Sequence, residues 1–156
     1  MFRFQLVNMM QNQVLGKSAM IVNKASGKAI DVPGASSKKG TAINQWEKNN
    51  RFNQRWRFVP AGKGVMIQSL LNNQCLDVEG AKSKSGVSIV QWEKSGDPNQ
   101  VWIPTKVGDR LYTFKSAMDA SLFLSVDKES IKDGAKLETY DKDSTSNVWE
   151  VVGCQQ

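Results

Sequence analysis

Three residue types that suit the binding of hydroxyl-bearing ligands recur in this chain in the same order and at the same spacing. They are an aspartate, a tryptophan and an asparagine, which occur as Asp31, Trp46 and Asn53 and again, 46 residues later, as Asp77, Trp92 and Asn99. A carboxylate accepts charge-assisted hydrogen bonds from two neighbouring hydroxyl groups, and an amide both donates and accepts. An indole ring adds a flat, mostly apolar face. Together these groups can hold a polar ring in a fixed orientation.

The composition removes the usual catalytic and metal-binding groups. The chain has no histidine, which excludes the commonest general base, the commonest metal ligand and every Ser-His or Cys-His nucleophile pair. The sequence also shows no paired-carboxylate motif and no cluster with metal-ligand spacing. We therefore expect a protein that is not an enzyme, with no catalytic residues, no cofactor and no metal site.

The two sets of residues belong to a longer internal repeat. Residues 20–64 align with residues 66–110 without a gap, and the C-terminal stretch fits a third, more divergent copy. Self-similarity at a fixed period of this size is typical of repeat architectures. We expect one domain of three repeats after a short extension, divided as an N-terminal extension at 1–19 and repeats at 20–65, 66–111 and 112–156.

Within each repeat, apolar residues alternate with polar ones, which predicts strands. Ile30 and Val32 share one face of such a strand, opposite Asp31. Turn-forming clusters separate these segments, notably residues 33–40 and 80–86. The pattern predicts about four short strands in each repeat and an all-β fold in which three repeats close the sheet and hide its edges.

A closing Gln-x-Trp motif ends the first two copies, at residues 54–56 and 100–102, and the third copy has Asn147-Val148-Trp149 at this place. Together with the Asp-Val strand and the Gln-Trp strand, these motifs make residues 20–156 resemble the ricin B-chain type of β-trefoil lectins. The resemblance implies a β-trefoil of three pseudo-repeats and, as a partner, galactose-type glycans or glycoconjugates.

In this family each repeat can bind one sugar, usually galactose or N-acetylgalactosamine. The resemblance implies these carbohydrate-binding residues: Asp31, Asn44, Trp46 and Asn53 in the first repeat, and Asp77, Trp92 and Asn99 in the second. Repeat two has Val90 where repeat one has Asn44, so we expect weaker binding there. Repeat three has Ser125, Tyr140 and Ser146 in place of the aspartate, tryptophan and asparagine, which predicts a weak or inactive third site.

Structural roles remain open for each of these residues. The two aspartates can start turns before Gly34 and Gly80, the two tryptophans can fill the space beneath a hairpin, and the two asparagines can cap loops. Their joint recurrence favours a ligand site, with the aspartate and tryptophan facing outward, because packing requires no carboxylate there. By contrast, we expect the tryptophans of the Gln-x-Trp motifs to lie in the core, with Gln54 and Gln100 bonded to backbone.

Charged loops leave two interpretations. Lys38 and Lys39 in repeat one, and Lys82 and Lys84 in repeat two, are adjacent in sequence to the predicted pockets. They keep a turn solvated, or they favour glycans that bear sulfate, sialate or phosphate. The net charge of +6 comes from interspersed charges without a long basic run, so no nucleic-acid partner is predicted.

Residues 1–8 contain no signal-peptide core, and no apolar run reaches the roughly 20 residues needed to span a bilayer. Cys75 and Cys154 have no counterparts in the other repeats, which favours reduced thiols. We therefore expect a cytoplasmic protein, with release to act on extracellular glycans as an alternative. Residues 1–19 are expected to form a strand that packs on the same barrel or contacts a second subunit as a homodimer. The alternative function is a β-trefoil protease inhibitor or protein-binding module that acts through its loops.

Overall fold

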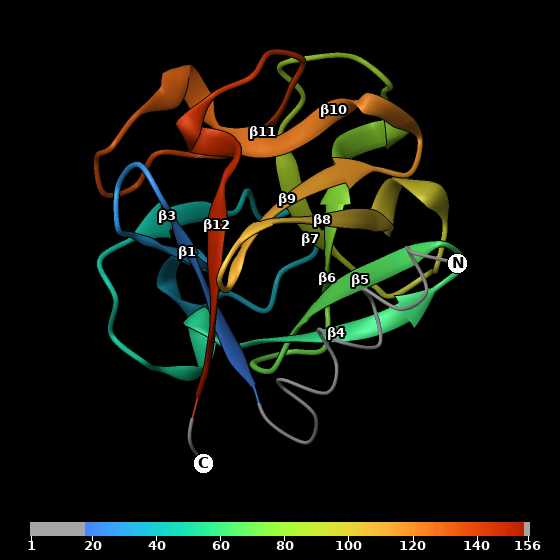
Figure 1. Cartoon of the computed structure of the whole chain (residues 1–156). Helices are drawn as coiled ribbons and strands as arrows, with labels where there is room; N and C mark the ends of the chain where they lie inside the picture. Colours follow the sequence, from blue (N-terminus) through green and yellow to red (C-terminus); the bar gives the residue numbers. More distant parts are fainter. Residues whose placement is uncertain (1–17, 155–156) are drawn as a thin grey trace.

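The computed structural model describes residues 18–154, which form twelve β-strands and short 3-10 helices (Figure 1). The strands are β1 (Ala19–Asn23), β2 (Ala29–Asp31), β3 (Asn44–Trp46), β4 (Trp56–Ala61), β5 (Gly64–Ser69), β6 (Cys75–Val78), β7 (Ile89–Trp92), β8 (Trp102–Gly108), β9 (Leu111–Ser116), β10 (Asp119–Val126), β11 (Leu137–Tyr140) and β12 (Trp149–Gly153). The 3-10 helices are η1 (Pro33–Ala35), η2 (Phe52–Gln54), η3 (Glu79–Ala81), η4 (Pro98–Gln100), η5 (Asp127–Glu129) and η6 (Thr145–Asn147).

Six strands form a closed antiparallel ring, in the order β1, β4, β5, β8, β9, β12 and back to β1. The other six pair as three hairpins, β2 with β3, β6 with β7, and β10 with β11. Each successive group of four strands thus gives two strands to the barrel and one hairpin beside it. In Figure 1, β1 and β12, the first and last strands of the barrel, lie side by side. This arrangement is a β-trefoil, and it confirms the predicted all-β fold.

The tryptophans of the three closing motifs tie each hairpin to the barrel. Trp56, Trp102 and Trp149 begin β4, β8 and β12 and are fully buried. Their Nε1 atoms donate hydrogen bonds to the carbonyl oxygens of Ile30 (3.0 Å), Leu76 (3.4 Å) and Leu124 (3.0 Å), respectively. The expected core position of these tryptophans is confirmed, and each one fixes the strand residue that precedes the aspartate position.

One hydrophobic core serves all three repeats. Its buried cluster joins the three closing-motif tryptophans to side chains from every repeat. Phe58 of β4 and Phe114 of β9 stack within it, with ring centroids 6.0 Å apart. Because a single repeat cannot bury this surface alone, the three repeats depend on one another for stability.

The loops at Gly40, Gly86 and Gly134, which join the second and third strands of each repeat, contact a neighbouring repeat. Their backbone N–H groups donate to the carbonyl oxygens of Gln91 (2.9 Å), Thr139 (2.8 Å) and Gln45 (2.8 Å), which lie in β7, β11 and β3. The φ angles of these glycines lie between +81° and +85°, a left-handed conformation that glycine adopts at little cost. Each loop therefore packs against the third strand of a neighbouring repeat, cyclically around the molecule.

The expected strand in the N-terminal extension lies, up to residue 17, outside the described residues. The expected boundary between residues 65 and 66 falls inside β5, and Ala19 begins β1. Cys75 and Cys154 are buried free thiols, and burial raises the pKa of Cys75 to about 11. Between residues 18 and 154, no helix has the length and apolar character needed to cross a membrane.

We expect Trp56→Phe to lower the free energy of unfolding by about 2–3 kcal/mol, because it removes buried volume and leaves the Ile30 carbonyl without its donor. Urea unfolding followed by circular dichroism measures this loss. Trp46→Phe is the matched control: Trp46 is 44% exposed, so its substitution should cost less than about 0.5 kcal/mol. Equal losses in the two variants would contradict the role assigned to Trp56.

Candidate functional site

The four residues predicted for repeat one surround a single pocket. It encloses about 210 Å³ and is lined by Asp31, Asn44, Trp46 and Asn53 with Pro33, Gly34 and Asn49. The β2–β3 hairpin creates this grouping, because its register places Asp31 opposite Asn44 and Ala29 opposite Trp46. Asn44 and Trp46 are two residues apart on β3, so both face the pocket.

Asp31 is 4% exposed and Asp77 is 6% exposed. Asp31 lines the pocket on the side opposite the core residues Ile30 and Val32, but its carboxylate is almost completely covered. The reason is the hydrogen bonding around each carboxylate. Oδ2 of Asp31 accepts a hydrogen bond from Nε2 of Gln54 at 2.8 Å and from Nδ2 of Asn53 at 3.0 Å. Burial raises the pKa of Asp31, the Gln54 hydrogen bond lowers it, and the negative charge of Asp133 raises it, with a net upward shift.

Gln54 positions the carboxylate of Asp31. Its Nε2 also donates to the carbonyl oxygen of Glu47 at 2.8 Å, and its Oε1 accepts from the backbone N–H of Asn49 at 2.8 Å. Gln100 repeats the arrangement with Asp77. The expected backbone bonds of both glutamines are confirmed, but sequence reasoning missed their bond to the aspartate. The equal separation of 23 residues within both pairs was the available signal.

Asn44 has an unsatisfied acceptor in the pocket wall. Its side chain is buried and its Oδ1 has no hydrogen-bond partner. Leaving a buried acceptor unpaired costs about 1–3 kcal/mol. A ligand that brings a hydroxyl donor into the pocket can satisfy this atom.

Trp46 presents an open aromatic face supported from repeat three. A Cβ at Gly134 would lie 3.5 Å from the ring of Trp46, an ordinary van der Waals distance, so this loop lies directly against the indole. Asp133 of the same loop accepts a hydrogen bond from the backbone N–H of Glu47 at 2.9 Å and forms an ion pair with Lys28 at 3.1 Å. Site one is thus built from two repeats.

Site two has the same plan with fewer polar contacts. Asp77 faces Val90 across the hairpin, where Asp31 faces Asn44. Nδ2 of Asn99 donates a long bond of 3.5 Å to the carbonyl oxygen of Val78, and its amide also helps to lower the pKa of Asp77, which burial raises. Trp92 is 44% exposed, as Trp46 is.

Lys39 lies at site two, although it belongs to repeat one. Its Nζ is 3.0 Å from Oε1 of Glu93 and 5.6 Å from the centroid of the Trp92 ring. The glycine loop at Gly40 brings it there. Although Lys39 is adjacent in sequence to the first pocket, it lies at the second site, where Glu93 pairs with its charge.

Repeat three lacks the aspartate and glutamine pair. The corresponding residues, Ser125 and Asn147, are buried, and Ser125 Oγ and Asn147 Oδ1 have no partner. Asn147 instead donates to the carbonyl oxygen of Lys142 at 2.8 Å. Glu138 lies opposite Ser125, and burial together with the charge of Asp127 raises the pKa of Glu138. In residues 18–154 no group of three or more potential ligands could hold a metal ion.

The raised pKa of Asp31 predicts a pH-dependent effect of Asp31→Asn. The folded protein binds a proton at Asp31 more tightly than the unfolded chain, whose pKa is near 3.8, so ionisation costs stability at neutral pH. Asp31→Asn keeps an acceptor for Gln54 without the charge. We expect it to be as stable as the unmodified protein or more stable near neutral pH, with a difference that shrinks as the pH falls through the raised pKa.

Urea unfolding at a series of pH values measures this difference. Asp119→Asn is a control of opposite sign, because hydrogen bonds from Ser121 lower the pKa of Asp119. That variant should be less stable than the unmodified protein at neutral pH, and its deficit should shrink as the pH falls through 3.8 and the lowered pKa. A deficit in Asp31→Asn that appears at neutral pH would contradict the predicted sign.

Comparison with known proteins gives the same fold. Residues 2–92 and 53–140 match the family described as ricin-type beta-trefoil lectin domain-like. ThreeFoil, a designed 3-fold symmetric protein, is 31% identical with a TM-score of 0.82, over 86% of this chain and 97% of that one. An exo-beta-1,3-galactanase from Clostridium thermocellum is 30% identical with a TM-score of 0.84, over 88% of this chain but only 30% of the galactanase.

A third structure, the C-half of the earthworm R-type lectin in complex with GalNAc, shares the fold at 20% identity. Its TM-score is 0.68, over 88% of this chain and 99% of that one. A search of curated proteins gave no match. The family match covers most of the sequence, and the chain belongs to the ricin-type β-trefoil lectin family.

Proposed function

We propose that this protein is a carbohydrate-binding lectin that recognises galactose or N-acetylgalactosamine through sites in repeats one and two. The observation that supports this most strongly is the buried Asp31 carboxylate, held by Gln54 and Asn53 in a pocket beside the open face of Trp46. A fixed acceptor next to an aromatic face matches a pyranose, which has hydroxyl groups on its rim and an apolar C–H face.

Each side chain has a separate role in this proposal. Asp31 retains acceptor capacity beyond its two protein hydrogen bonds and takes hydroxyl donors of the sugar. Trp46 stacks on the C–H face. Asn44 offers its unpaired Oδ1 to a further hydroxyl. No step of this recognition breaks or forms a covalent bond, so the proposed protein is a binding module and not an enzyme.

The galactose class agrees with the names of two structural neighbours, although only the first reaches 30% identity. One neighbour is named for its action on beta-1,3-galactan and another was solved with GalNAc. The earthworm lectin shares only the fold with this chain, so the sugar preference rests mainly on the site residues. The sites differ in strength: repeat two has Val90 in place of Asn44 and Lys39 near its tryptophan.

Binding at one site should be weak, because a monosaccharide makes only a few hydrogen bonds worth about 1 kcal/mol each. Dissociation constants should be roughly millimolar to high micromolar, about −4 to −6 kcal/mol. Two sites on one scaffold strengthen attachment to a surface with many glycans, since the second contact is intramolecular.

The first prediction from this proposal is that the protein is retained on a galactose resin and that free galactose elutes it. The Asp31→Ala, Asp77→Ala double variant should lose this retention, because both sites lose their charged acceptor. Val107→Ala is the control, since Val107 is an exposed apolar residue of β8 outside the site. Circular dichroism establishes that each variant is folded. Unchanged retention in the folded double variant would refute the site assignment.

The second prediction ranks the two sites. Trp46→Ala should weaken binding of a methyl galactoside by roughly three- to tenfold at site one, and Trp92→Ala should remove the weaker site. Both tryptophans are equally exposed, so the pair is matched for effects on stability. Titration followed by NMR separates the two sites through the indole signals. Tighter binding at Trp92 than at Trp46 would contradict the ranking.

A further inference from the structure

A second pocket adjoins the candidate sugar site of repeat one. It encloses about 350 Å³ and shares Gly34, Asn49 and Asn53 with that site, while Arg51, Phe52 and Leu71 form its outer part. Because the two pockets share these three residues, the second pocket lies directly beside the site of Trp46 and Asp31. The outer pocket is therefore placed to contact an attached sugar or substituent.

The outer pocket is lined by one aromatic and one positively charged side chain, Phe52 and Arg51, and a second guanidinium, that of Arg55, lies beside Phe52 outside the lining. Phe52 is 56% exposed, and the guanidinium carbon of Arg55 lies 5.2 Å from the centroid of its ring. Asn50 holds Arg55 through its carbonyl oxygen at 3.2 Å and its Oδ1 at 3.4 Å. Such a guanidinium is pre-organised, so less rotamer entropy is lost when it pairs with an anion.

The two arginines have no carboxylate partner in the described part of the chain. The ion pairs found there join Lys28 to Asp133, Lys39 to Glu93, and Arg110 to Glu150. Lys39, which sequence reasoning singled out for acidic ligands, is thus neutralised by Glu93. Arg51 and Arg55 thus add uncompensated positive charge beside candidate site one.

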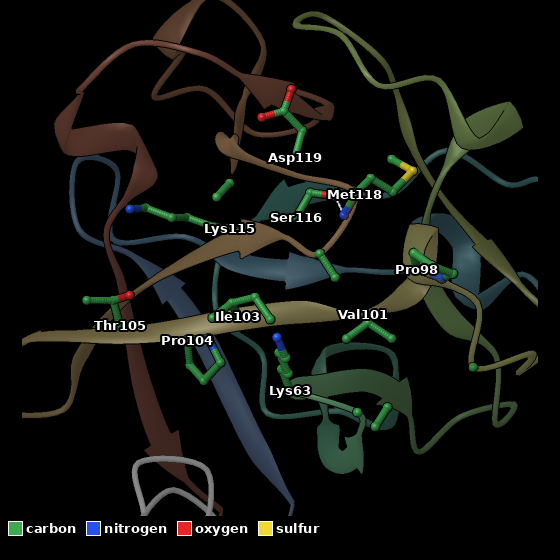
Figure 2. A pocket seen from close by; sticks show the side chains of 15 residues that line it. Lys63, Pro98, Val101, Ile103, Pro104, Thr105, Lys115, Ser116, Met118 and Asp119 are labelled. Carbon is green, nitrogen blue, oxygen red and sulfur yellow. Dashed lines mark hydrogen bonds between the residues drawn. The ribbon is translucent and has the colours of Figure 1, made fainter. Parts of the chain in front are cut away.

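Repeat two lacks this arrangement. Its aligned residues are Asp97, Pro98 and Val101 in place of Arg51, Phe52 and Arg55. Beside Pro98 and Val101 lies a larger, mainly apolar groove of about 620 Å³, also lined by Ile103 and Met118 (Figure 2). The fold therefore does not require the two arginines at this place.

We propose that the outer pocket extends site one into a subsite for an anionic group. The ligand is a galactose-type glycan whose neighbouring sugar or substituent carries a carboxylate or a sulfate. Guanidinium groups pair with either anion through two parallel hydrogen bonds, and the exposed ring of Phe52 covers the apolar side of the added unit. This inference rests on the proposed galactoside binding.

The test compares lactose with 3′-sialyllactose and with lactose sulfated at the 3′ position, by calorimetric titration. A Trp92→Ala background removes the second site. At an ionic strength of about 0.01 M, at least one acidic ligand should bind roughly three- to tenfold more tightly than lactose, and this ratio should approach one at about 1 M. The acidic ligand that gains affinity identifies the anion as carboxylate, sulfate or both.

Substitution assigns the gain to the outer pocket. Arg51→Gln combined with Arg55→Gln should bring the ratio of acidic to neutral affinity close to one at low ionic strength. Arg57→Gln removes the same charge from an exposed position of β4 outside the pocket, and it should keep the ratio. A retained ratio in the double variant would overturn the proposal.

Failure of the anionic subsite and failure of the lectin proposal give different results. Lactose binding without a preference for either acidic ligand overturns the anionic subsite and leaves the lectin proposal in place. Absence of binding for all three ligands in the folded protein overturns both. A preference that persists at about 1 M ionic strength also counts against the subsite, because exposed charges are screened there.

Discussion

The candidate sites depend on one buried hydrogen bond, from the Gln54 amide to the Asp31 carboxylate, and on its copy between Gln100 and Asp77. The glutamine is two residues before the buried tryptophan, whose indole N–H binds the carbonyl oxygen just before the same aspartate. The Gln-x-Trp segment thus fixes two consecutive residues of the hairpin, which are Ile30 and Asp31 in repeat one. The cost is a buried carboxylate with a raised pKa, which a structure selected only for stability has no reason to retain.

Repeat three separates the contribution of the tryptophan from that of the glutamine. Trp149 still donates to the Leu124 carbonyl oxygen at 3.0 Å, and the β10–β11 hairpin has the same place in the fold. The Gln–Asp hydrogen bond is absent from this repeat. The atoms at the corresponding positions, Ser125 Oγ and Asn147 Oδ1, have no hydrogen-bond partner. The tryptophan bond therefore suffices for the architecture, whereas the glutamine bond is needed only where a carboxylate must be held in the pocket wall.

Local patterns were sufficient to predict the strands and a closed all-β fold, and the resemblance to ricin B-chain lectins implied the β-trefoil. The 46-residue repeat and the alternation around Ile30 and Val32 predicted the strands, and Phe58 on the same strand face as Trp56 predicted that this tryptophan lies in the core. The features that the sequence did not predict involve contacts between repeats or within the closed fold. The expected outward face of Asp31 did not reveal that its partners almost completely cover the carboxylate. Likewise, the position of Lys39 in the sequence did not reveal that it lies at site two. Burial and loop contacts of this kind arise only when the barrel closes. No residue type or spacing within one repeat encodes the approach of Lys39 to Trp92.

The cyclic contacts also explain how repeats with the same strand arrangement acquire different sites. Each pocket has an aromatic residue from one repeat and an adjoining loop from another, so a substitution in one loop changes the neighbouring site. At site one, Asp133 pairs with Lys28 and raises the pKa of Asp31, whereas at site two Lys39 pairs with Glu93 beside Trp92. Arg51 in the outer pocket and Arg55 beside Phe52 then add positive charge at site one. Because these changes lie in loops and not in the hydrogen bonds of the closing motif, charge around a site can change without loss of the fold that supports it.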